Sequence, residues 1–254
     1  MAQTKRVTRQ PAFVLRRRPY SESSLLLDIF SRQYGLQIVL AKGARRLKSN
    51  YRGVLHPFQS LTIGWSGRRE LMTLTQAEMV GYQPALGMEN LKCGFYANEL
   101  LLRFLHRGDP HEELFDQYAL LLGRLYDGLD ADWSLRLFEK AALADIGYGL
   151  VLDHEVLTNR PIQTDKRYLY VPDKGPINAD NASFAGVSIS GQALTDLLNE
   201  KPGDRPHRSE CKRLMQVCLQ QHLNAKPLQC RKVFRQVAKL REGGSTESVI
   251  SSTA

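Results

Sequence analysis

The apolar residues of the chain change their period near Pro84, and this change constrains the fold more than any other feature. Before it, five short apolar runs read as strands, at 13–17, 23–30, 36–41, 58–67 and 70–80. Turns containing Gly, Pro or Ser separate them, and "SGRR" at 66–69 is typical of a hairpin. Five strands are too few for a seven-stranded sandwich, so they predict a small closed barrel.

After Pro84 the apolar residues recur at helical spacing. The pattern predicts helices at 91–107, 110–129, 132–149, 190–199, 205–223 and 226–240. Short connections between the first three indicate a bundle. Between 150 and 189 the helical pattern is lost, leaving a strand candidate at 166–172 and a turn at 173–176. The tail at 241–254 has too little apolar content to order itself.

These patterns predict an α+β protein with two main parts. The boundaries that we expect are a barrel unit at 1–82, a helical unit at 83–240 with an irregular insert at 150–189, and a disordered tail at 241–254.

Positive charge is concentrated in the barrel unit. Residues 1–69 hold 14 lysines and arginines but only two carboxylates, Glu22 and Asp28, whereas the rest of the chain has a slight excess of acids. From Ile29 to Arg69 there are eight cations and no carboxylate. A one-sign field on one domain favours a polyanionic partner, although a basic surface kept for solubility is the alternative.

No motif in the sequence commits the chain to catalysis. There is no Walker loop, no dinucleotide-binding glycine motif and no HExxH, and His106 and His111 miss the spacing that places two ligands on one helical face. The four cysteines form no CxxC pair, which argues against a disulfide scaffold and against a zinc site built as two CxxC pairs, so we expect reduced thiols. No apolar run approaches the ~20 residues of a membrane span, and no signal-peptide core follows the basic N-terminus.

Cations interleaved with aromatic residues favour nucleic-acid binding, because phosphates bind the cations and bases stack on the rings. Phe30, Phe58 and Trp65 are expected in the barrel core, whereas Tyr20, Tyr34 and Tyr51 fall in predicted loops. The candidate DNA-binding residues are Arg16, Arg17, Arg18, Tyr20, Arg32, Lys42, Arg45, Arg46, Lys48, Tyr51, Arg52, Arg68 and Arg69.

Several stretches together resemble the RecO family of bacterial DNA repair proteins. They include "RPYSESSLLLDIF" (18–30), "AKGARR" (41–46), "YANELLLRFL" (96–105), "LRLFEKAALADIGYG" (135–149) and "KPLQCRKVFR" (226–235). They occur in the family's order and extend over nearly the whole chain. The resemblance implies an N-terminal OB fold, a helical domain, and a cytoplasmic, nucleoid-associated recombination mediator that is not an enzyme.

The resemblance also implies partners. They are single- and double-stranded DNA, which such proteins anneal, the acidic, phenylalanine-ended tail of single-strand-binding protein, the protein RecR and, indirectly, the strand-exchange recombinase. Arg136 is the candidate to receive the tail, and a solvated helix cation is the alternative. Many members carry a four-cysteine zinc module after the "GYG" helix, but the insert at 150–189 has no cysteine, so we expect no structural zinc. The resemblance also implies that no enzymatic cofactor is needed.

Two other function classes stay open at this point. A nuclease that uses the barrel to grip its substrate would need metal-binding carboxylates, and the basic unit offers only Glu22 and Asp28. An RNA-binding or protein-interaction module of the same fold would have similar charge.

Overall fold

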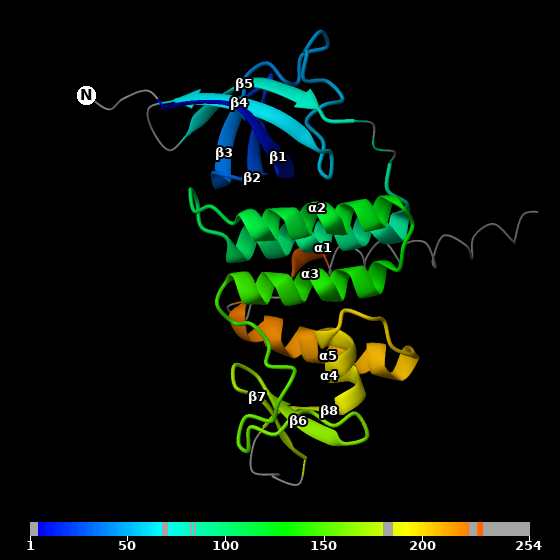
Figure 1. Ribbon diagram of the computed structural model, residues 1–254. Coiled ribbons are helices and arrows are strands. Elements are labelled where there is room, and N and C mark those ends of the chain that lie inside the picture. The colour runs from blue at the N-terminus through cyan, green and yellow to red at the C-terminus, as the bar shows by residue number, and fades with distance from the viewer. Residues whose placement is uncertain are drawn as a thin grey trace, which may run out of the picture.

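The computed structural model of the protein describes residues 5–67, 71–81, 83, 85–179, 185–223 and 228–230. Figure 1 shows its elements in layers, with the barrel at one end, the helices across the middle and a small sheet at the other end. The predicted helix at 226–240 is described only at 228–230, and the predicted tail lies outside the described residues.

Five strands form a closed N-terminal barrel, which confirms the predicted fold. They are β1 (Lys5–Tyr20), β2 (Ser24–Ser31), β3 (Gly35–Ala41), β4 (Leu61–Gly67) and β5 (Met72–Met79). Their order is β1-β2-β3-β5-β4, and every neighbouring pair is antiparallel except β3 and β5. The antiparallel pairing of β4 with β5 agrees with the hairpin signal at 66–69.

Strand β1 is longer than the predicted 13–17. The apolar pattern missed the first half of the strand because that half is largely polar. Residues Lys5–Ala12 pair with β4, and Ala12–Tyr20 pair with β2, so one strand closes the barrel on both sides. The register shifts between Val7 and Gln10, where Arg9 has a φ of 52°. This irregularity breaks the alternation of apolar residues that the sequence pattern relies on.

The barrel has one apolar cluster inside and another on its outer face. Trp65 is buried in the interior with Ile29 and Val39, as predicted. Phe30 and Phe58 are also buried, but their expected place in the barrel core is wrong: both belong to the cluster between the barrel and the helices. Successive strand residues point to opposite faces, so Ile29 faces inward and Phe30 outward.

Within the described residues, the barrel is followed by the helices α1 (Met88–Phe104), α2 (Glu112–Tyr126), α3 (Ala131–Asp145), α4 (Gly191–Leu198) and α5 (Arg205–His222). Helices α1 and α2 cover the outer face of the barrel, where Phe115 of α2 lies 5.3 Å from Phe13 and 5.4 Å from Phe30 between ring centroids. A second aromatic pair, Phe58 with Phe95 of α1, has a centroid distance of 5.0 Å. These contacts continue the core from the barrel into the helices.

The insert contains a three-stranded sheet of order β7-β6-β8, not only the one strand that the sequence predicts. Its strands are β6 (Arg167–Val171), β7 (Gly175–Asn178) and β8 (Val187–Ser190). Strand β6 confirms the candidate at 166–172. The other two have four residues each, which is too short for a clear alternating pattern.

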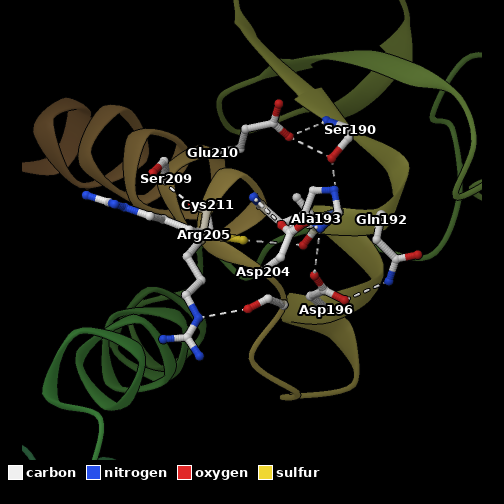
Figure 2. Close-up of polar contacts among 12 residues, drawn as sticks. Ser190, Gln192, Ala193, Asp196, Asp204, Arg205, Ser209, Glu210 and Cys211 are labelled. Carbon is white, nitrogen blue, oxygen red and sulfur yellow. Dashed lines mark hydrogen bonds and ion pairs between the residues drawn. The ribbon is translucent and has the colours of Figure 1, made fainter.

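Glu210 fastens this sheet to the helices (Figure 2). Its carboxylate accepts hydrogen bonds from the backbone and the hydroxyl of Ser190, at 2.8 and 2.6 Å, while that hydroxyl caps α4 at Ala193. Burial alone would raise the pKa of Glu210, but the hydrogen bonds from Ser190 and Arg167 outweigh it and lower the pKa. The insert is therefore held by charge-assisted hydrogen bonds as well as by apolar contacts.

Candidate nucleic-acid interface

The basic loop that follows β3, residues 42–52, is tied to the turn between β1 and β2. The Arg45 amide donates to the Ser23 carbonyl at 2.9 Å, and the Arg45 guanidinium donates to the Ser21 carbonyl at 3.1 Å. Ala44 and Leu55 are buried in the barrel interior and anchor the loop at both sides. The loop is thus built onto the barrel, and it projects from it on the side away from α1 and α2 (Figure 1).

The cations of this loop are available to a ligand. All five cationic side chains of the loop are exposed, and none of them pairs with a carboxylate among the described residues: Lys42, Arg45, Arg46, Lys48 and Arg52. Unpaired exposed cations on one loop bind phosphates by charge, and this binding releases counterions and depends on salt.

A groove of about 610 Å³ separates the loop from β5. Lys42, Arg46 and Lys48 line one wall, and residues 75–78 of β5 line the other. Tyr51 also lines the groove, but it is partly buried against the barrel interior, and this burial raises the pKa of its hydroxyl. Tyr51 therefore packs the loop down onto the barrel while its remaining surface faces the groove.

The three arginines near the end of β1 differ in their contacts. Arg16 and Arg18 both bond to the buried carboxylate of Asp28, at 2.7 and 3.3 Å, whereas Arg17 is exposed and pairs with no described carboxylate. Asp28 neutralises one of the two charges that face it, so a net positive charge remains on this strand.

Arg32 lies elsewhere, at the junction between the barrel and α2. Its guanidinium forms two hydrogen bonds with Asp116, at 3.0 and 2.9 Å, and also bonds to Glu112. The hydrogen bond from Arg32 lowers the pKa of Asp116. Arg32 therefore holds two parts of the protein together, and the sequence could not reveal this because its partners lie about 80 residues away.

The tyrosines also divide between surface and interior contacts. Tyr20 is 45% exposed and directly precedes Ser21, so it lies beside the basic loop. Tyr34 packs edge-on against Trp65 at a centroid distance of 5.4 Å and is half-buried. Arg68 and Arg69 lie outside the described residues. The structure thus brings Tyr20 and Tyr51 to the loop and places Tyr34 in the turn between β2 and β3, against Trp65.

Comparison with known proteins decides the family. Residues 3–83 match the family described as Recombination protein O N terminal, and residues 87–232 match Recombination protein O C terminal. The chain is 42% identical to the "DNA repair protein RecO" of Dechloromonas aromatica (strain RCB), over 92% of this chain and 98% of that protein. It is 41% identical to the protein of the same name from Nitrosococcus oceani, over 92% of this chain and 96% of that protein. The chain belongs to the RecO family.

This RecO family chain buries the arginine expected to contact a protein partner. The Arg136 side chain is 3% exposed, and its Nε lies 3.0 Å from Oε2 of Glu139, while the Tyr96 hydroxyl donates to Oε1 of the same carboxylate at 2.5 Å. The alternative of a solvated helix cation is therefore wrong. A role of Arg136 in partner binding stays a prediction, and in this structure such a contact would require the guanidinium to leave Glu139.

The insert and the thiols give no sign of a metal-binding arrangement in the part of the chain that the structure describes. Cys93, Cys211 and Cys218 are free thiols, of which Cys211 and Cys218 are buried, and burial raises the pKa of each of these two thiols to about 12. No group of three or more His, Cys, Asp or Glu side chains within the described ranges is placed to hold a metal ion. Across the same ranges, no helix has the length and apolar character needed to cross a bilayer.

Sequence reasoning missed some polar residues that the fold brings to the same barrel. Arg6 and Arg9 are exposed on the first half of β1, outside the strand that the sequence predicts. Thr75 and Gln76 line the groove opposite the basic loop, where Glu78 is the one acid among the described lining residues. The pairing of β3 with β5 places them there, and only an expected OB topology could have found them.

Proposed function

We propose that this chain is a recombination mediator in DNA repair. It binds single- and double-stranded DNA, anneals complementary strands, and helps to load the strand-exchange recombinase onto DNA coated by single-strand-binding protein, together with RecR. The observation that carries the proposal is the set of exposed, unpaired cations on the loop at 42–52. They flank a groove on a barrel whose family is named for DNA repair and recombination.

Charge neutralisation provides the mechanism of annealing. Two DNA strands repel each other through their phosphates, and cations that bind both strands reduce this repulsion. The loop would hold one backbone along the groove, while Tyr20 at the end of β1 offers an exposed ring beside the loop. No step of this mechanism needs nucleotide hydrolysis or a cofactor.

The experiment removes four loop charges at once by changing Lys42, Arg45, Arg46 and Lys48 to Ala. DNA affinity should fall roughly 100-fold near physiological salt, and the slope of log affinity against log salt should decrease by up to about 3.6, because each lost phosphate contact removes about 0.7–0.9. The rate of annealing of labelled complementary strands should fall with it.

The matched control changes four exposed cations on other surfaces to Ala: Arg160, Lys166, Lys201 and Arg205. Both variants lower the formal net charge from +9 to +5, so total charge is held equal. The control should keep the salt slope of the wild-type protein. An unchanged slope in the loop variant would show that the DNA site lies elsewhere.

Protein partners would bind at the helical domain. The acidic, phenylalanine-ended tail of single-strand-binding protein needs an apolar surface and a nearby cation. A cavity of about 880 Å³ between the barrel and α1 offers both, since Phe58, Phe95 and Leu102 line it and Arg17 lies on its rim. We propose this cavity as the docking place for the tail, with Arg136 as the alternative contact.

A further inference from the structure

Leu47 is an exposed apolar side chain in an otherwise basic loop. It is 82% exposed, more than any other large apolar residue of the described chain. Arg45, Arg46 and Lys48 surround it in sequence and are also exposed. Single exposed leucines are common on protein surfaces, so exposure alone would mean little. Its position within the loop is what distinguishes it.

The loop holds Leu47 at the tip of a turn. The Ser49 amide donates to the Arg46 carbonyl at 3.1 Å, which makes Leu47 and Lys48 the two central residues of the turn. The Arg52 guanidinium donates to the Leu47 carbonyl at 3.4 Å, and so supports the turn from the other arm of the loop. The backbone thus directs an apolar side chain outward at the point where the cations are densest.

We propose that Leu47 is a wedge that inserts between adjacent bases of DNA whose phosphates the flanking cations hold. Apolar side chains that enter base steps unstack them, and the nearby cations supply the phosphate contacts that keep the wedge in place. The inference rests on the proposed DNA-binding function and adds to it a residue that deforms the nucleic acid.

The wedge gives the loop a second role in annealing. Phosphate contacts bring two strands together but leave each strand in its own stacked conformation. A leucine between two bases breaks the stack at one step, and so frees those two bases to rotate into pairing position with the incoming strand. A lipid surface is less suited to this loop, because membrane binding needs an apolar face of several residues and Leu47 is the one large aliphatic side chain within residues 42–52.

The test measures base unstacking directly. A single-stranded oligonucleotide carrying 2-aminopurine fluoresces more strongly when the analogue is unstacked. Saturating wild-type protein should raise this fluorescence about twofold or more, and Leu47→Ser should remove most of the rise while the salt slope of binding stays unchanged. Leu47→Met, which keeps an apolar side chain, should restore the rise.

Leu157→Ser is the matched control, because Leu157 is 59% exposed and lies in the insert, and it should leave the fluorescence unaltered. A full rise with Leu47→Ser at saturation would overturn the wedge, and the proposed DNA surface would still stand if the four-cation variant loses its salt slope. A Leu47→Ser variant that loses binding to phosphatidylserine vesicles and keeps the fluorescence rise would also overturn it, in favour of a lipid contact.

Discussion

The two ends of the β2–β3 hairpin carry cations in opposite situations. At one end, the loop after β3 presents Lys42, Arg46 and Lys48 without any described carboxylate partner. At the other end, Arg32 in the turn between the strands is engaged by Asp116 and Glu112 of α2. Residues 29–69 contain no acid of their own, so acids contributed by the helices decide which cations stay free.

The difference shows that a basic segment has to be judged together with the acids that the rest of the fold brings to it. A local excess of cations predicts a polyanionic partner, but the protein's own helices can supply the anion at one end of the same hairpin. The end that faces the helices becomes a structural junction. The end that faces away keeps its charge for DNA, which is the function that we propose for it.

Glycine substitutions at the two ends should give the largest contrast. Gly35 has a φ of +59°, and a Cβ there would lie 1.7 Å from the Asp109 carbonyl oxygen in the α1–α2 connection. Gly43 has a φ of +68°, but its nearest neighbour is the flexible Arg46 side chain at 3.5 Å. Gly35→Ala should therefore lower the free energy of unfolding by more than about 4 kcal/mol, and Gly43→Ala by only about 1 kcal/mol.

Urea unfolding followed by circular dichroism measures both values. The larger loss reflects a backbone clash that neither the barrel nor the helices can relieve without separating. Equal losses for the two variants would mean that the junction yields easily, and the contrast between a packed end and an open end would fail.

The sequence predicted the order of elements well because that order depends on local patterns. The change from short alternating runs to helical spacing near Pro84 was enough to predict a barrel followed by helices. Which face a residue occupies depends on distant partners instead. Phe30 was expected inside the barrel, yet it contacts Phe115, which lies 85 positions later in the chain.

At the candidate site too, local composition predicted some features and long-range packing decided the others. The composition of residues 42–52 alone indicated a basic loop, and the fold leaves its cations exposed. The engagement of Arg32 and the burial of Arg136 could not be predicted, because the first needs the docking of α2 on the barrel and the second needs the packing of α1, α3 and α5. The sequence contains Leu47 among the cations of the loop, but only the structure shows that a turn places its side chain at the exposed tip.

Arg136 provides the next contrast, between a buried cation and the exposed loop cations. Its side chain is 3% exposed and that of Glu139 is fully buried, so Arg136→Met should remove the guanidinium that offsets a buried carboxylate charge and lower the free energy of unfolding by about 3 kcal/mol. Changing Glu139→Leu in addition should recover most of that loss, because an apolar pair can replace a buried ion pair. Thermal and urea unfolding of the three variants measure this.

The stable double variant then separates the two proposed places for the tail of single-strand-binding protein. We expect it to bind an acidic, phenylalanine-ended peptide as the wild type does, because the guanidinium is enclosed. Phe95→Ser, which alters the apolar cavity, should weaken the same binding. Loss of peptide binding in the double variant alone would assign the contact to Arg136.

Arg32→Ala should have the smallest effect on DNA, although Arg32 belongs to the same basic segment as the loop. Because its guanidinium is already occupied by Asp116 and Glu112, removing it should leave the salt slope of DNA binding unchanged, whereas Arg45→Ala should reduce that slope by about 0.7–0.9.

The melting temperature of Arg32→Ala should fall slightly. The pairing of Arg32 with Asp116 stabilises the fold fully above the ordinary Asp116 pKa of 3.8, and this stabilisation is lost as pH falls through the lowered pKa. The difference in melting temperature between the wild type and Arg32→Ala should therefore disappear in acid. A reduced salt slope in Arg32→Ala would mean that DNA competes with α2 for this arginine, and that the two ends of the hairpin are one continuous surface.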